Sequence, residues 1–126
     1  MPVDPTPVAL NHLHLTAEDP DAVIRFYSEL LGFRRDPSLP GFMWLGSMQM
    51  AVTKGEPIRN PRFHIGFRMD SNGHVDALRA KLIEHGVEVS EPFASGSSYS
   101  CGFTDPAGYR VEVYSDAGIS ALGTLA

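Results

Sequence analysis

The sequence lacks the features that mark several common classes of protein. Its 126 residues include one cysteine, Cys101, so neither a disulfide framework nor a cysteine-ligated zinc cluster can form within one chain. No apolar run approaches the roughly 20 residues needed to span a bilayer, and no Gly-rich phosphate-binding loop precedes a helix. Residues 1–5 also lack the basic and apolar regions of a signal peptide. These absences predict a cytoplasmic protein with no membrane partner.

Positive charge is also scarce. The chain has 10 Lys and Arg residues against 15 Asp and Glu residues, which gives a formal net charge of −5 at pH 7. Proteins that bind nucleic acid gain most of their affinity from Lys and Arg side chains that neutralise phosphates. The composition therefore argues against a nucleic-acid partner. The length is that of one domain, long enough to bury a core without disulfides.

The sequence does contain one pattern of elements that occurs twice. The first copy is a strand, a helix and three strands, predicted at residues 10–16, 19–32, 34–35, 41–45 and 48–52. The second copy repeats this order at residues 63–69, 75–86, 87–89, 98–104 and 109–115. Asp19 is a suitable cap for the first helix, and Gly32 and Gly86 end the two helices.

This repeat predicts an α+β fold in which two βαβββ units form a curved mixed sheet. We expect a single domain, 1–126, with units at about 8–53 and 62–116 joined by a polar linker. A short N-terminal arm precedes the units, and a C-terminal tail, either a short helix or disordered, follows them. Because a sheet of this kind cannot hide its own edges, we also expect a homodimer.

Two histidines occupy matching places in the two units, and a glutamate lies in the last strand. His12 and His64 each lie in the first strand of their unit. Side chains alternate between the two faces of a strand, so His12 shares a face with His14, and Glu112 shares one with Tyr114. Two imidazoles and one carboxylate are the ligand set of an open, catalytic metal site.

Three segments carry a family resemblance. They are Asn-His-Leu-His-Leu at 11–15, Phe-Tyr-Ser-Glu-Leu-Leu-Gly-Phe at 26–33 and Asp-Pro-Ala-Gly-Tyr-Arg-Val-Glu at 105–112. In these segments the chain resembles the vicinal oxygen chelate superfamily, which includes glyoxalases, extradiol dioxygenases, fosfomycin-resistance enzymes and bleomycin-resistance proteins. The resemblance implies a cup-shaped sheet. It also implies that His12, His64 and Glu112 bind a divalent metal, which would be iron, manganese, nickel or zinc.

The resemblance further implies that the metal site is open. By the repeat, the first-unit counterpart of Glu112 falls near Ala51, where glyoxalase I-like members carry a glutamate. Alanine cannot bind a metal, although Gln49 shares its strand face and is a candidate substitute. Three protein ligands leave positions for two adjacent oxygens of a small-molecule substrate, such as a diol, hydroxy acid, hydroxy ketone or catechol. His14 is the candidate for proton transfer, and Tyr114 for a further polar contact.

Within the superfamily several chemistries stay open. Extradiol dioxygenases share the ligand triad, but here Gly102 occupies the position of their acid/base tyrosine. Fosfomycin-resistance thiol transferases usually carry threonine at the position of His14. Bleomycin-resistance proteins bind ligands without a metal in a cleft of aromatic residues, which Trp44 is suited to line. Arg68 and Arg110 have the charge to bind an anionic substrate, although a structural ion pair is the more common role of such residues.

We therefore expect a metal-dependent enzyme, either a glyoxalase-type lyase or isomerase or a ring-cleaving dioxygenase. A metal-free bleomycin-resistance-like binding protein and a fosfomycin-resistance-type thiol transferase are the alternatives.

Overall fold

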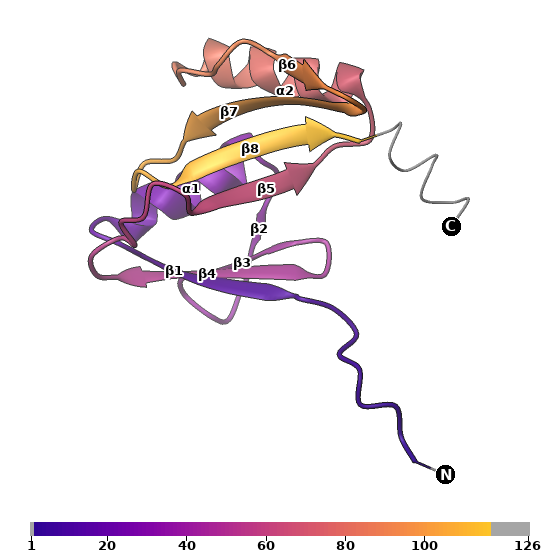
Figure 1. The fold of residues 1–126 in the computed structure, drawn as a ribbon. Coiled ribbons are helices and arrows are strands. Elements are labelled where there is room, and N and C mark those ends of the chain that lie inside the picture. The colour runs from indigo at the N-terminus through magenta and orange to yellow at the C-terminus, as the bar shows by residue number, and fades with distance from the viewer. Residues whose placement is uncertain (1, 117–126) are drawn as a thin grey trace. The chain divides into compact units, whose positions relative to one another are not determined.

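The computed structural model describes residues 2–116, which form two βαβββ units (Figure 1). The boundary between the units along the chain lies between Glu56 and Pro57. Unit 1 contains β1 (His12–Ala17), α1 (Pro20–Leu30), β2 (Arg34–Arg35), β3 (Phe42–Leu45) and β4 (Met48–Lys54). Unit 2 contains β5 (His64–Arg68), α2 (Asn72–Glu84), β6 (Phe93–Ser95), β7 (Ser98–Thr104) and β8 (Arg110–Ser115). The predicted α+β class is confirmed.

Unit 1 is a four-stranded sheet with the order β1-β4-β3-β2. Strands β1 and β4 are parallel, and the other two pairs are antiparallel. The Asp19 carboxylate accepts a hydrogen bond from the backbone N–H of Ala22 and so caps α1, as predicted. The helix packs on one face of the sheet. The core between them is apolar and includes Leu15, Val23, Tyr27, Met43, Met50 and Val52.

Unit 2 repeats this arrangement with the order β5-β8-β7-β6, and here β5 and β8 are the parallel pair. The Ser71 hydroxyl caps α2 by accepting a hydrogen bond from the N–H of His74. The helix packs on β7 and β8. Its core includes Ile65, Val75, Leu82, Cys101, Phe103, Val111 and Val113. Cys101 is buried among these apolar side chains.

In both units one face of the sheet is buried against the helix and the other is open. Along β8, Val111, Val113 and Ser115 are buried, while Arg110 is exposed and Glu112 is half-buried. This period of two is what a half-buried strand requires. The polar side chains of the parallel strands therefore lie on the open face of each sheet.

The hairpin between β7 and β8 turns at residues 105–108, as predicted. Asp105 is only 5% exposed, and its Oδ1 accepts hydrogen bonds from the N–H groups of Ala107 and Tyr109 at 2.9 and 3.0 Å. Gly108 has φ of 92°, in the left-handed region that favours glycine. The turn therefore sets the register in which β8 begins.

The third strand of unit 2 does not lie where the sequence pattern predicts it. The strand predicted at residues 87–89 is wrong, because the third strand of unit 2 lies at Phe93–Ser95. The N–H of Val87 is held by the carbonyl of Leu82 at the end of α2. Farther along, the Ser90 hydroxyl accepts the hydrogen bond from the N–H of Gly102. The backbone N–H of Ser90 also donates to the carbonyl oxygen of Gly102 at 2.9 Å. Ser90 is therefore held to β7 by one backbone and one side-chain bond, and the regular pairing of β6 with β7 begins at Phe93. The predicted C-terminal tail lies outside the described residues.

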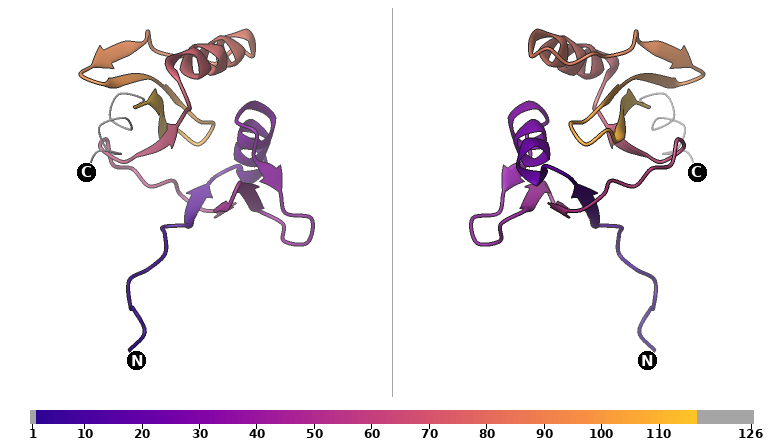
Figure 2. Two further views of the ribbon diagram at one scale, coloured as in Figure 1. Left: turned by 90° about the vertical axis from the view of Figure 1, so that its right-hand side faces the viewer. Right: turned by 90° about the vertical axis from the view of Figure 1, so that its left-hand side faces the viewer.

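Residues 2–11 form an extended arm that leaves unit 1 ahead of β1 (Figure 2). Val3, Val8 and Leu10 in this arm are highly exposed. Neither helix among residues 2–116 has the length and apolar character required to cross a bilayer.

The core of unit 2 gives a test of the helix register. Leu82 and Ile83 are neighbouring apolar residues of α2, but Leu82 is 0% exposed and Ile83 is 46% exposed. We expect Leu82→Ala to lower the free energy of unfolding by about 2–5 kcal/mol, because it leaves a cavity. Ile83→Ala is the matched control and should cost less than about 1 kcal/mol. Urea unfolding measures both values, and equal losses would contradict this register.

Candidate metal and substrate site

The candidate site in unit 2 is built on the parallel strands β5 and β8. Their register pairs His64 with Arg110 and Gly66 with Glu112. Paired residues on neighbouring strands point to the same face, so these four residues share the open face of the sheet. Gly66 contributes no side chain, and a Cβ at this position would contact the ring of Tyr114 at 3.6 Å. The alternation that buries Val111 is therefore what exposes the two predicted metal ligands of this unit.

The hydrogen bonds of His64 determine which of its ring nitrogens is available. Its Nδ1 lies 3.2 Å from the carbonyl oxygen of Arg62, which can only accept, so Nδ1 carries the proton. The lone pair is then on Nε2. Metal-binding histidines commonly hold their other nitrogen in this way. Within residues 2–116, no hydrogen bond or ion pair engages the Glu112 carboxylate.

His64 and Glu112 line one hollow of about 400 Å³ in unit 2. Its lining residues are Pro61, Arg62, His64, Arg110, Val111 and Glu112. Both predicted ligands therefore face the same solvent-filled space. A small ligand in this hollow could contact an imidazole, a carboxylate and two guanidinium groups.

Unit 1 places its histidines on the corresponding face. His12 pairs with Gln49, and His14 pairs with Ala51, in the parallel register of β1 and β4. The Nδ1 of His12 lies 3.1 Å from the side-chain carbonyl oxygen of Asn11, so its Nε2 also carries the lone pair. The Nε2 of His14 lies 2.7 Å from the Thr53 hydroxyl. Both histidines are exposed.

Comparison of the two registers identifies the unit 1 counterpart of Glu112. In unit 2, Glu112 lies opposite Gly66, which is two residues after His64. In unit 1, Ala51 lies opposite His14, which is two residues after His12. Ala51 is therefore the structural counterpart of Glu112, as the repeat predicted. Gln49 is instead directly opposite His12 and is half-buried.

The predicted ligands are divided between the units, with His12 in unit 1 and His64 and Glu112 in unit 2. Within either unit, the described residues 2–116 bring no three His, Cys, Asp or Glu side chains together to hold a metal ion. The other predicted residues have clear positions. Tyr114 is half-buried on the same face as Glu112. Arg68 forms an ion pair with Asp116 at 2.6 Å, which is the structural role expected of it.

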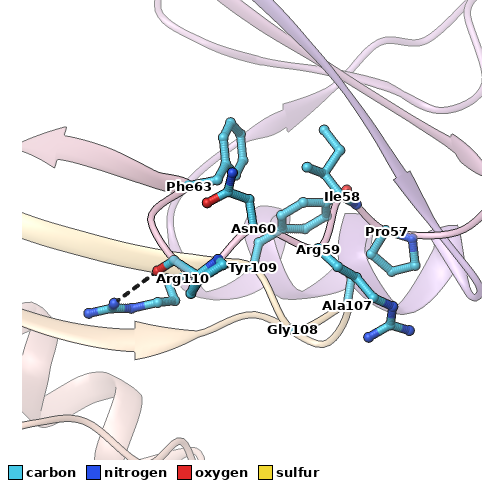
Figure 3. Close-up of a pocket in the computed structure, with 10 residues that line it drawn as sticks. Pro57, Ile58, Arg59, Asn60, Phe63, Ala107, Gly108, Tyr109 and Arg110 are labelled. Carbon is cyan, nitrogen blue, oxygen red and sulfur yellow. Dashed lines mark hydrogen bonds between the residues drawn. The ribbon is translucent and has the colours of Figure 1, made fainter.

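A second hollow, of about 340 Å³, adjoins the first in unit 2 (Figure 3). It is lined by Pro57, Ile58, Arg59, Asn60, Pro61, Phe63, Ala107, Gly108, Tyr109 and Arg110. The Tyr109 hydroxyl accepts a hydrogen bond from the N–H of Ile58 at 3.0 Å, and its ring packs edge-on against Phe63. These contacts attach the segment before β5 to the start of β8. Arg110 lines both hollows.

Sequence reasoning missed the contribution of Arg62 and Asp36. Arg62 lies in an irregular segment, where no periodicity indicates the direction of a side chain. Asp36 accepts a hydrogen bond from the indole N–H of Trp44 at 3.0 Å, and Trp44 pairs with Gln49 on the open face of unit 1. The indole bond, followed by bonds from Ser38 and Leu39, lowers the pKa of Asp36 from 3.8 to about 2. A lone aspartate eight residues before a tryptophan gives no sequence signal of this contact.

The lowered pKa of Asp36 predicts a pH dependence of stability. A carboxyl group whose pKa falls on folding stabilises the protein above its unfolded pKa, and that contribution is lost as the pH drops through about 2. We expect Asp36→Asn to lower the thermal midpoint at neutral pH. Between about pH 5 and about pH 2 the variant should lose less of its midpoint than the unsubstituted protein. Parallel pH curves for the two proteins would contradict the assignment.

Residues 9–113 match the family described as the Glyoxalase/Bleomycin resistance protein/Dioxygenase superfamily. The chain therefore belongs to this superfamily. Its members are typically metal-dependent, bind small-molecule substrates and often form dimers. None of the curated proteins matches this sequence.

Solved structures agree with this assignment. Lactoylglutathione lyase from Agrobacterium tumefaciens is 26% identical with a TM-score of 0.74, over 90% of this chain and 97% of that chain. A possible glyoxalase from Bacillus cereus is also 26% identical with a TM-score of 0.74, over 85% and 98% of the two chains. A glyoxalase/bleomycin resistance protein/dioxygenase from Nocardioides, at 19% identity and a TM-score of 0.69, shares the fold over 90% and 86%.

Proposed function

We propose that this protein is a metal-dependent enzyme that acts on a small substrate with two adjacent oxygen atoms. His12, His64 and Glu112 would hold a divalent metal, which would be iron, manganese, nickel or zinc. The observation that carries the proposal is the pair of His64 and Glu112 on the open face of β5 and β8, in one hollow. Family membership supports it, because this superfamily is typically metal-dependent.

The chemistry of the donor atoms fits such a metal. His12 and His64 each contact an oxygen acceptor through Nδ1, which leaves Nε2 as the ring nitrogen that would bind the metal. The Glu112 carboxylate is not engaged elsewhere in residues 2–116. Because neither unit gathers three such groups, this ligand set draws on both units, from one chain or from two. We propose a homodimer, since β1 and β5 are edge strands of their sheets.

Ala51 supports an open site. Its methyl group replaces the fourth ligand that its register would otherwise supply, so the protein provides three ligands and the substrate the rest. When bound, a metal at this site would supply Lewis acidity for the substrate oxygens or, as iron, would activate dioxygen. This arrangement favours a lyase, isomerase or dioxygenase that uses two substrate oxygens.

The proposed roles of His14 and Tyr114 follow from the faces that they share with the ligands. His14 lies two residues after His12, and its Nε2 is held by the Thr53 hydroxyl, which orients the ring. It would accept and return a substrate proton at Nδ1. Tyr114 lies two residues after Glu112 on the same face and would offer its hydroxyl as a further polar contact.

Metal content tests the proposed ligands. Protein purified without chelator should contain about one divalent metal per chain, as measured by elemental analysis. His64→Ala and Glu112→Ala should each weaken metal binding at least about tenfold, because each removes a ligand. His85→Ala is the matched control, since His85 lies at the end of α2 with Nδ1 on the carbonyl of Lys81. Metal-free protein would instead favour the metal-free binding protein, and equal metal binding by all variants would show that His64 and Glu112 are not ligands.

The role of His14 is tested by separating metal binding from turnover. We expect His14→Ala to retain its metal and to lower kcat by about 10²-fold or more, because it removes only the proton-transfer group. Activity is measured on the hydroxy ketone, hydroxy acid or catechol that the metalloprotein converts. If metal is lost along with turnover, His14 is a ligand and not a base.

A further inference from the structure

Three arginines of unit 2 line the two adjoining hollows. Arg62 and Arg110 line the hollow of His64 and Glu112, and Arg59 and Arg110 line the adjoining one (Figure 3). All three are exposed. Within residues 2–116, none of them has a carboxylate partner. Arg68 and Arg79 differ in this respect, since they pair with Asp116 and Glu91.

This grouping is unusual in a chain with a net charge of −5. Among the described residues 2–116, Glu112 is the only acidic residue that lines either hollow. Two guanidinium groups against one carboxylate leave the hollow of His64 and Glu112 net positive. Clefts lined by one sign of charge attract ligands of the opposite sign. The local charge therefore indicates an anionic ligand, although the protein as a whole is acidic.

Arg110 has the best position to bind such a ligand. It lies opposite His64 in the register of β5 and β8, and it precedes Glu112 by two residues on the same face. Its guanidinium makes one long hydrogen bond, 3.5 Å from Nη1 to the carbonyl oxygen of Pro61 (Figure 3). A guanidinium has five N–H donors in a planar fork, so most of them remain available. That fork matches the paired oxygens of a carboxylate or phosphate.

We propose that Arg110, with Arg62, binds a carboxylate or phosphate group of the substrate beside the metal ligands. The inference rests on the proposed function and narrows its substrate class. Of the compounds with two adjacent oxygens, it selects hydroxy acids and phosphorylated hydroxy ketones over neutral diols and catechols. Arg110 is thus a specificity-determining residue. Its charge holds the anionic end of the substrate while the two adjacent oxygens face His64 and Glu112.

The test measures anion binding in chelator-treated protein, so that no metal contributes. Lactate and inorganic phosphate are titrated separately and followed by amide chemical shifts. At least one should bind saturably and shift the signals of β5 and β8, and the tighter of the two identifies the anionic group. Arg110→Ala should weaken that binding about tenfold or more, because it removes a charge-assisted, bidentate contact. Arg110→Lys keeps the charge but lacks the planar fork of N–H donors. Its affinity for the anion should lie between those of the unsubstituted protein and Arg110→Ala.

Arg68→Ala is the matched control, because Arg68 is an exposed arginine of β5 that is held by Asp116. It should bind the anion as the unsubstituted protein does. The inference is overturned if neither anion binds, if Arg110→Ala binds unchanged, or if Arg68→Ala loses as much. A thermal unfolding transition shows whether each variant is folded. If Arg110→Ala is unfolded, the anion affinity of Arg110→Lys is used in its place.

The failure of this inference can be told apart from the failure of the proposed function. Arg110→Ala should keep the full metal content of the unsubstituted protein, since Arg110 is not a ligand. If the protein binds metal but no anion, the anionic substrate is contradicted and the metal-dependent enzyme still stands. If the protein binds an anion but contains no metal, the metal-dependent enzyme is contradicted and the protein is an anion-binding protein.

Discussion

The parallel pairing of the first and last strand in each unit is the constraint on which the rest of the structure depends. In β1–β4 and in β5–β8 it places side chains from distant parts of the sequence directly opposite one another. The helix between these strands covers one face, so the apolar half of each strand is buried and the polar half is open. The candidate site is a consequence of this division. Burial of Ile65 and Val111 leaves His64 and Glu112 on the opposite face.

The two units use the same scaffold with different side chains. Where unit 2 has Gly66 opposite Glu112, unit 1 has His14 opposite Ala51. A glutamate in place of Ala51 would give a symmetric set of two histidines and two carboxylates. Its absence makes the proposed ligand set asymmetric, with the candidate base in one unit and the proposed carboxylate ligand in the other. This asymmetry distinguishes the chain from the glyoxalase I pattern while the fold stays the same.

Charge adds a second level of specificity to this scaffold. The irregular segment before β5 contributes Arg59 and Arg62, and β8 contributes Arg110. Tyr109 anchors that segment through the N–H of Ile58, so a core aromatic helps to position polar groups at the surface. Arg68, on the same face of β5, has a different role because Asp116 neutralises it. Local pairing, and not residue type, separates a structural arginine from one that is available to a ligand.

The sequence by itself determined the α+β class, the repeat and the alternation of faces, because these depend on local periodicity and on turn residues such as Asp105 and Gly108. The family resemblance added the candidate ligands, and the repeat identified Ala51 as the counterpart of Glu112. The position of β6 was decided by tertiary contacts, since Ser90 bonds to Gly102 through both its backbone N–H and its hydroxyl, and regular pairing begins only at Phe93. The contacts of Asp36 and Arg62 were likewise decided only by the folded chain. Periodicity describes which way a side chain points, but the partner that it meets depends on how distant segments pack.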